Sequence, residues 1–131
     1  MPPITVSLLV LTASGGQLWP VSRTTLPMPE GFSAKTAAAA AIDNTWGRDR
    51  LVALVECGWL RTAEGVQLTL VGLLDAIAVP TDAKLIDRQT DAETLAALLL
   101  VGAKWRTDPA LRQALARFGW PTEILDPRAW L

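Results

Sequence analysis

LVALVECGWL at residues 51–60 and VQLTLVGLLDAIAV at residues 66–79 flank the turn signal TAEG at residues 62–65. Both long segments are strongly apolar, as strands are when a sheet is covered on its faces. The pattern predicts two central antiparallel strands of a covered sheet, joined by the turn. The other predicted elements surround this pair.

The second segment partly alternates between polar and apolar side chains. Gln67, Thr69 and Asp75 fall on one face of the strand, and leucines fall on the other. A carboxylate on the face of a sheet needs solvent or a partner, so Asp75 is expected to line a pocket or to pair with an arginine. Gly72 predicts a bulge or the close approach of another element.

The N-terminal segments predict a hairpin. ITVSLLVLT at residues 4–12 has the composition of a buried strand, SGG at residues 14–16 supplies turn glycines, and QLWPVS at residues 17–22 returns. Pro20 cannot donate a ladder hydrogen bond, so the second strand is expected at an edge of the sheet. Residues 24–32 contain two prolines and a glycine and are expected to form a structured loop.

An alanine-rich helix is predicted after this loop. Ser33 can serve as its N-cap, because a serine hydroxyl accepts a hydrogen bond from a backbone N–H of the first turn. Alanine is the residue that a helix accommodates at least cost, so the run is expected to continue to about Thr45. Gly47 is expected to close the helix.

Two further helices are predicted near the C-terminus. Thr90 with Glu93 has the form of a capping box and predicts a helix to about Ala103. TDP at residues 107–109 places a proline at the first position of a helix that ends near residue 118. Residues 119–131 are too apolar for a free tail and are expected to pack on the domain or on a partner. A single α/β (α+β) domain of residues 1–131 is therefore expected.

Composition limits the compartment and the partners. The chain has 131 residues, half of them apolar and 19% charged, which is typical of a globular domain. A net charge of −1 without any basic run argues against a nucleic-acid partner. No apolar stretch is long enough for a signal peptide or a membrane span. The single cysteine fits a reducing compartment, and a bacterial cytoplasmic protein is expected.

The absence of histidine restricts the chemistry further. It excludes Ser-His-Asp and Cys-His nucleophile systems, histidine-containing zinc sites and histidine general bases. Cys57 lies in an apolar run and is expected to be a small buried hydrophobe, with Glu56 raising the pKa of its thiol. Any catalysis would have to use carboxylates, lysines or a group of the substrate.

Residues 26–47 read LPMPEGFSAKTAAAAAIDNTWG. This stretch resembles the signature of Nudix hydrolases, in which Leu-Pro-Gly-Gly precedes a helix with an alanine pair, an Arg-Glu-Val triplet, a Glu-Glu pair and a closing glycine. Leu26-Pro27, the alanines, Ile42 and Gly47 fall where that pattern has them, and the order of predicted elements agrees over about residues 4–118. The resemblance implies a Nudix-like mixed sheet.

The same stretch lacks the glutamates that the Nudix signature contains. The helix of the family presents glutamates that converge on Mg²⁺, a hard ion that prefers oxygen ligands. At those positions this chain has Ala40-Ala41 and Asn44-Thr45, and Asp43 falls where the family has no fixed residue. A degenerate Nudix-like member is therefore expected, with no metal site, no cofactor and no metal-dependent hydrolysis.

Six tryptophans fall on different predicted elements. Indole rings ordinarily pack in cores, but they also line pockets and anchor protein interfaces. The residues expected to bind a ligand are Trp19, Arg23, Glu30, Trp46 and Asp75. The residues expected at an interface are Trp120, Trp130 and Leu131.

The expected function is a non-catalytic Nudix-like binding or interaction domain that self-associates or engages a protein partner. The tail favours this hypothesis, because a small domain with surplus apolar surface can bury it against another chain. The alternative is a small-molecule-binding protein of a biosynthetic pathway, or an enzyme without a metal in which Glu30, Asp43 or Asp75 serves as general acid or base.

Overall fold

Two β-hairpins lie side by side and form the sheet of this protein. The computed structural model describes residues 4–14, 17–27, 33–47, 49–63, 65–75 and 92–120. In chain order the elements are β1 (Ile4–Ser14), β2 (Gln17–Pro27), α1 (Ala34–Trp46), β3 (Leu51–Thr62), β4 (Gly65–Leu74), α2 (Ala92–Thr107) and α3 (Pro109–Arg117). The predicted α+β class is confirmed.

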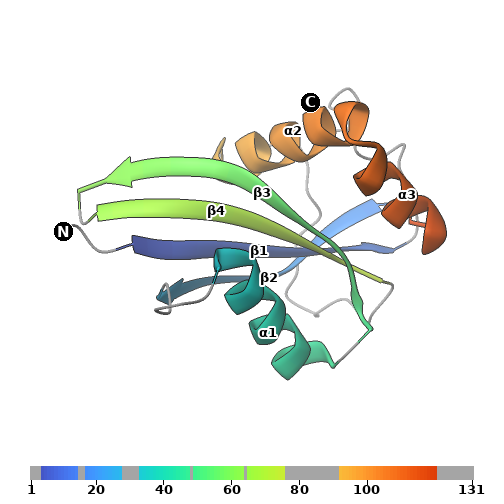
Figure 1. The fold of residues 1–131 in the computed structure, drawn as a ribbon, viewed down its shortest axis with the longest axis horizontal. Coiled ribbons are helices and arrows are strands. Elements are labelled where there is room, and N and C mark those ends of the chain that lie inside the picture. The colour runs from blue at the N-terminus through green and yellow to red at the C-terminus, as the bar shows by residue number, and fades with distance from the viewer. Residues whose placement is uncertain are drawn as a thin grey trace.

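The sheet is mixed. β1 pairs antiparallel with β2, β3 pairs antiparallel with β4, and β1 pairs with β4 in parallel between the hairpins. The strand order is β2-β1-β4-β3 (Figure 1). Both hairpins are therefore confirmed, but the prediction that residues 51–60 form a central strand is wrong. β3 lies at an edge of this sheet, because the second side of β4 is taken by β1.

β2 lies at the other edge, as Pro20 predicts. The register shifts in the middle of the hairpin, where Val10 pairs with Ser22 and Leu11 pairs with Pro20. β2 thus bulges next to its proline. Bulges and prolines are both tolerated at a sheet edge, where a lost ladder hydrogen bond costs least.

Two predicted boundaries are wrong. β2 continues to Pro27, where a loop was expected from residue 24, and the remainder of that loop, 28–32, lies outside the described residues. Pro27 pairs with Thr5 at the very end of the edge strand, where its missing N–H disrupts little. β4 ends at Leu74, short of the predicted Val79.

The helix ends follow the local signals. The hydroxyl of Ser33 accepts a hydrogen bond from the backbone N–H of Thr36 at 3.1 Å, and Gly47 ends α1 with φ +95°. Asp108 caps α3 directly before Pro109, so the predicted start signals of α1 and α3 are confirmed. α2 runs to Thr107, one turn beyond its predicted end, and Thr90 of the predicted capping box lies outside the described residues.

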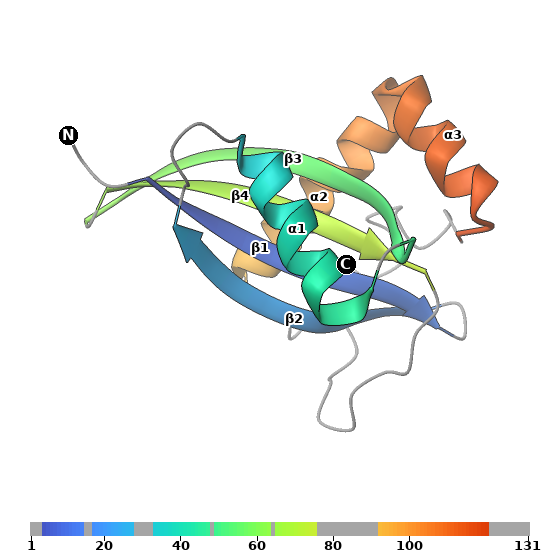
Figure 2. The same ribbon diagram turned by 60° about the horizontal axis from the view of Figure 1, so that its bottom comes forward.

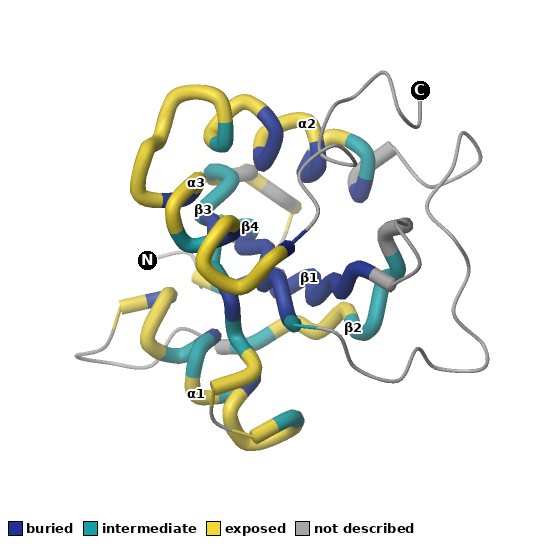
Figure 3. The backbone as a smooth tube through the Cα atoms, turned by 90° about the vertical axis from the view of Figure 1, so that its right-hand side faces the viewer, coloured by how far each residue is buried: buried dark blue, intermediate teal, exposed yellow. Residues whose placement is uncertain are grey.

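Helices cover both faces of the sheet. α1 packs on one face, and α2 and α3 pack on the other (Figures 1 and 2). The deepest burial follows the central strands (Figure 3). The cluster on the α1 face contains Val6, Leu8, Val10, Ala34, Ala38, Ile42, Leu68, Leu70 and Leu74. The cluster on the α2–α3 face includes Leu9, Leu11, Val71, Leu73, Leu98, Val101, Leu111, Leu115 and Trp120. None of the described helices is long and apolar enough to cross a membrane.

Gly72 marks a place where α1 and the sheet approach closely. A Cβ atom on Gly72 would lie 2.8 Å from Cδ1 of Ile42, whose side chain is fully buried. The predicted close approach is therefore confirmed. Two small residues of the same helix, Ala34 and Ala38, are also buried against the sheet.

We expect Gly72→Ala to destabilise the protein by about 1 kcal/mol, because Ile42 has to shift inside a packed cluster. Ile42→Val removes the methyl group in question. It should therefore cost clearly less in the Gly72→Ala background than in the wild type, where such a change costs about 0.5–1.5 kcal/mol. A double-mutant cycle from urea unfolding measures this coupling. Additive free energies of unfolding would contradict the packing described here.

Candidate functional site

A groove of about 210 Å³ lies between the sheet and α2. All four strands contribute to it, together with the α2 segment from Thr94 to Leu100. Ser7 pairs with Thr69 in the parallel register, and Leu9 pairs with Arg23 across the first hairpin. The sheet register thus brings two hydroxyls, an apolar side chain and a guanidinium together on the α2 face.

A bulge in β3 forms another side of the groove. The register of β3 against β4 shifts between Glu56 and Gly58. Gly58 has φ +134°, a conformation that favours glycine. Cys57 is the extra residue of this bulge, and Gly58 pairs with Thr69 and Trp59 with Leu68. Cys57, Gly58 and Trp59 are all part of the lining of the groove. Trp59 keeps 56% of its surface exposed.

Cys57 contributes a neutral thiol to the groove. Its Sγ lies 3.7 Å from the carbonyl oxygen of Ala97 in α2, and its side chain packs against the α2–α3 cluster. Burial raises the pKa of this thiol from 9.0 to about 11, Lys104 opposes the rise, and Glu56 adds to it. The predicted effect of Glu56 has the right sign but is not the main cause. A protonated thiol is a weak nucleophile, so Cys57 acts here as a packing residue.

Arg23 is the predicted ligand-binding residue that the structure brings to this groove. Its side chain is exposed at the β2 edge. Among the groove residues in the described part of the chain, Arg23 alone carries a formal charge at neutral pH. A guanidinium has five N–H donors, so it can hold an acceptor of its own chain and still bind a ligand.

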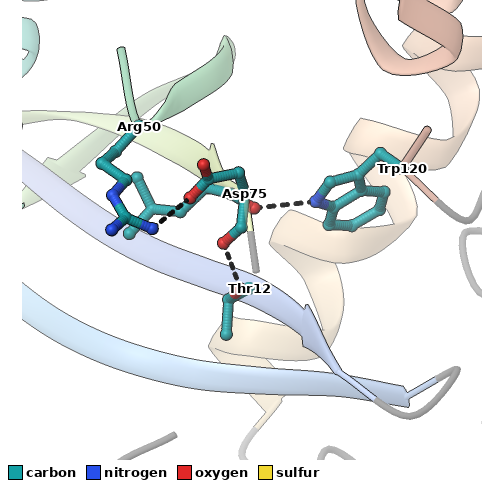
Figure 4. A network of polar contacts seen from close by, with 5 residues as sticks. Thr12, Arg50, Asp75 and Trp120 are labelled. Atoms are coloured by element: carbon teal, nitrogen blue, oxygen red, sulfur yellow. Dashed lines mark hydrogen bonds and ion pairs between the residues drawn. The ribbon is translucent and has the colours of Figure 1, made fainter. Parts of the chain in front are cut away.

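Asp75 lies elsewhere, at the end of β4, where it pairs with an arginine. Its Oδ1 lies 3.2 Å from Nη1 of Arg50. The side chains of Arg50 and Asp75 are 45% and 35% exposed, as in ordinary surface ion pairs. The ion pair therefore adds only about 0–1 kcal/mol to the free energy of unfolding. The backbone around it is fixed more firmly: the Asp75 N–H donates to Arg50 O, and the Thr12 hydroxyl donates to Asp75 O at 2.7 Å (Figure 4). The arginine partner predicted for Asp75 is therefore present.

Trp120 has an intramolecular role instead of a surface one. Only 6% of its surface is exposed, and its indole packs in the α2–α3 cluster. Its Nε1 donates a hydrogen bond to Leu74 O at 2.9 Å (Figure 4). Trp120 therefore links the residues directly after α3 to the end of β4. Of the two alternatives that the sequence left open, packing on the domain or on a partner, Trp120 follows the first.

The other predicted ligand-binding residues of the described chain lie away from the groove. Trp46 is half-buried and packs against the cluster on the α1 face, on the other side of the sheet from Arg23. Trp19 pairs with Thr12, five residues along β1 from the groove residue Ser7. Glu30, Trp130 and Leu131 lie outside the described residues.

The acidic residues of the described chain do not converge. No group of three or more Asp, Glu or Cys in these residues is arranged to hold a metal ion. On α1, Asp43 and Asn44 are exposed, and the hydroxyl of Thr45 donates to the carbonyl oxygen of Ala41 within the helix. That hydroxyl is therefore engaged in its own helix.

Sequence reasoning missed most of the groove. Trp59, Thr94 and Leu100 line it, and none of them was singled out as a binding residue. One signal was present: a glycine inside an apolar strand often marks a bulge or a close approach, and Gly58 stands directly before Trp59. Thr94 and Leu100 gave no signal, because only the packing of α2 places them there.

The raised pKa of Cys57, about 11, predicts a stability change at alkaline pH. Below pH 9 the thiol is protonated in both the folded and the unfolded protein, so its contribution to the free energy of unfolding is constant. Between about pH 9 and 11 the unfolded state loses the proton first, and the free energy of unfolding should fall. Urea unfolding at pH 8, 9 and 10 should show a steeper decline for the wild type than for Cys57→Ala. Parallel declines would show that the folded protein does not hold this proton.

Comparisons with known proteins include a distant structural likeness. No family model matches this chain, and no curated protein matches it. Among solved structures, it is similar to the Ap4A hydrolase of C. elegans at a TM-score of 0.42 and 11% identity, covering 90% of this chain and 98% of that chain. A likeness this distant does not assign the chain to a family.

Proposed function

We propose that this chain is a binding domain that does not carry out metal-dependent hydrolysis, with the groove between the sheet and α2 as its binding site. The observation that carries the proposal is the charge pattern of the groove. Among the described residues that line the groove, Arg23 alone carries a formal charge, and the thiol of Cys57 stays protonated. General acid–base catalysis needs a group that titrates near neutral pH, whereas ligand binding needs only shape and complementary charge.

The Nudix-like resemblance supports the same proposal. If α1 is the counterpart of the Nudix helix, its metal-binding positions carry Ala40, Ala41, Asn44 and Thr45. Methyl groups cannot bind Mg²⁺, and the Thr45 hydroxyl is bonded within the helix. This helix would then serve the fold by packing closely on the sheet.

The alternative enzyme without a metal would need a carboxylate at the binding site. In the described chain no Asp or Glu lines the groove. Asp75 is held by Arg50 at the end of β4, and Asp43 is exposed on α1 on the other face of the sheet. Neither position resembles the enclosed environment that tunes a carboxylate for proton transfer.

A hydrolysis assay tests the proposal directly. The protein is incubated with Ap4A and MgCl₂, and nucleotide release is followed by chromatography. We expect no release above the protein-free blank, and no rise in Tm when Ap4A and Mg²⁺ are added together. Release that is lost in Asp43→Asn but kept in Asp49→Asn, a matched exposed carboxylate after the same helix, would overturn the proposal.

Self-association is a second candidate function, favoured by apolar side chains on the helical layer. Leu99 and Leu100 of α2 are 41% and 45% exposed, and Phe118 beyond α3 is 48% exposed. Large apolar residues of this kind anchor interfaces when they form a patch. The partner proposed here is a second copy of this chain, which would also cover the tryptophan of β3.

Light scattering after gel filtration tests this second candidate. We expect a wild-type dimer at about 100 µM that Leu99→Lys converts to a monomer, since a desolvated ammonium disfavours an apolar interface. Ala103→Lys, one turn along the exposed surface of α2, is the matched control and should stay dimeric. A monomeric wild type at this concentration would remove self-association as a function.

A further inference from the structure

The proposed binding site can be assigned a class of ligand from its volume, its hydroxyl groups and its charge, and this inference rests on the proposed function. The groove has a volume of about 210 Å³. An apolar cavity of roughly 150 Å³ accepts one benzene ring. The groove therefore has room for one six-membered ring that carries a small substituent.

Alanines of α2 leave this space open. Ala96, Ala97 and Leu100 are the apolar residues of α2 in the lining, and Leu9 adds apolar surface from β1. Ala97 is buried in the α2–α3 cluster, whereas Ala96 is exposed and thus lies at the rim. A longer side chain at position 96 can therefore enter the groove without displacing a core residue.

Two hydroxyls lie side by side on the sheet side of the groove. Ser7 of β1 pairs with Thr69 of β4, and both residues line the groove. Neighbouring strands are roughly 4.8 Å apart, so one polar atom of a ligand can reach both hydroxyls. Each hydroxyl has one donor and two acceptor lone pairs. Thr69 also pairs with Gly58, where an added Cβ atom would meet no residue beyond its chain neighbours within 4 Å.

The charges around these hydroxyls favour an uncharged ligand. Arg23 is exposed at the β2 edge and already interacts with another group of the protein, so its charge is not assigned to the ligand. The thiol of Cys57 is neutral. A charged group placed against two hydroxyls and apolar side chains would lose its hydration without gaining a counter-charge.

We propose that this groove binds a small uncharged molecule with one aromatic or branched aliphatic group and one hydroxyl or carbonyl oxygen. The oxygen bonds to the hydroxyls of Ser7 and Thr69. The apolar body contacts Leu9, Ala96 and Leu100. Apolar surface with a few convergent polar groups is the usual composition of a small-molecule site.

Benzyl alcohol is the probe, with three comparators that each change one feature. Toluene lacks the hydroxyl, benzoate carries a negative charge, and benzylamine carries a positive charge. Backbone amide NMR titrations give the affinities and locate the site. We expect benzyl alcohol to bind about fivefold more tightly than toluene, because a hydrogen bond contributes about that factor, with shifts at Ser7, Thr69 and Ala97. Benzoate and benzylamine should bind more weakly than benzyl alcohol.

Ala96→Leu is the decisive variant, because it fills the groove from its rim at an exposed helical position that tolerates leucine. It should abolish the shifts that benzyl alcohol causes at Ser7 and Thr69. Ala103→Leu is the matched control, since Ala103 is also exposed and lies two turns further along α2, outside the lining of the groove. It should bind benzyl alcohol like the wild type.

A second variant, Ser7→Ala/Thr69→Val, removes both hydroxyls and should bind benzyl alcohol and toluene equally. Its control is Thr24→Val, because Thr24 pairs with Leu8 of the α1-face cluster and so lies on the other face of the sheet. The control should keep the preference for the alcohol. If the double variant does not fold, the preference of the wild type and the result with Ala96→Leu decide the question.

The proposed ligand class would be overturned by tighter binding of benzoate or benzylamine, or by equal binding of toluene and benzyl alcohol to the wild type. Absence of shifts with benzyl alcohol at about 20 mM, or binding that survives in Ala96→Leu, would also overturn it. With no Ap4A release, each of these results leaves a non-catalytic binding domain. Ap4A release that depends on Asp43 removes the proposed function itself, whatever benzyl alcohol does.

Discussion

The parallel pairing of β1 with β4 is the constraint on which the rest of the structure depends. It runs from Ile4 opposite Val66 to Thr12 opposite Leu74 and joins two hairpins that are far apart in sequence. Parallel strands require a long crossover connection, here the chain through β2, α1 and β3. Once this pairing forms, β2 and β3 are placed at the edges, and both faces of the central strands must be covered. α1 covers one face, and α2 with α3 covers the other.

A set of hydrogen bonds fixes the carboxyl end of this central pair. Leu74 and Asp75 are bonded to Trp120, Thr12 and Arg50, which come from the end of α3, from β1 and from the segment before β3. Buried backbone carbonyls need such partners, and each typical bond adds about 1 kcal/mol. These hydrogen bonds link four segments at one point (Figure 4). The indole of Trp120 belongs to the α2–α3 cluster, and its N–H bonds that cluster to the end of β4.

The groove lies toward the opposite end of the same strands. Ser7 and Thr69 pair five residues before Thr12 and Leu74, which corresponds to roughly 16 Å along the strands. At this end the sheet carries smaller polar side chains, and the bulge in β3 interrupts the regular surface. The irregular face leaves space between sheet and helix, and that space carries the charge of Arg23.

The sequence by itself determined the features that depend on neighbouring residues. Ser33, Gly47 and the Asp108-Pro109 pair mark the helix ends, because caps are contacts over two to four residues. Apolar runs and turns identified both hairpins. Among the predicted ligand-binding residues that the structure describes, Arg23 lines the groove. Its position just before the proline-rich loop that follows the hairpin was the local signal.

Only the tertiary structure decided the strand order, the edge position of β3, the burial of Trp120 and the membership of Trp59, Thr94 and Leu100 in the groove. Each of these features depends on which distant segments meet. Local propensity does not encode which side of β4 receives β1, because both of its sides offer the same backbone donors and acceptors. That choice is made by the summed burial on two faces, and the groove is the part of one face that the helices leave open.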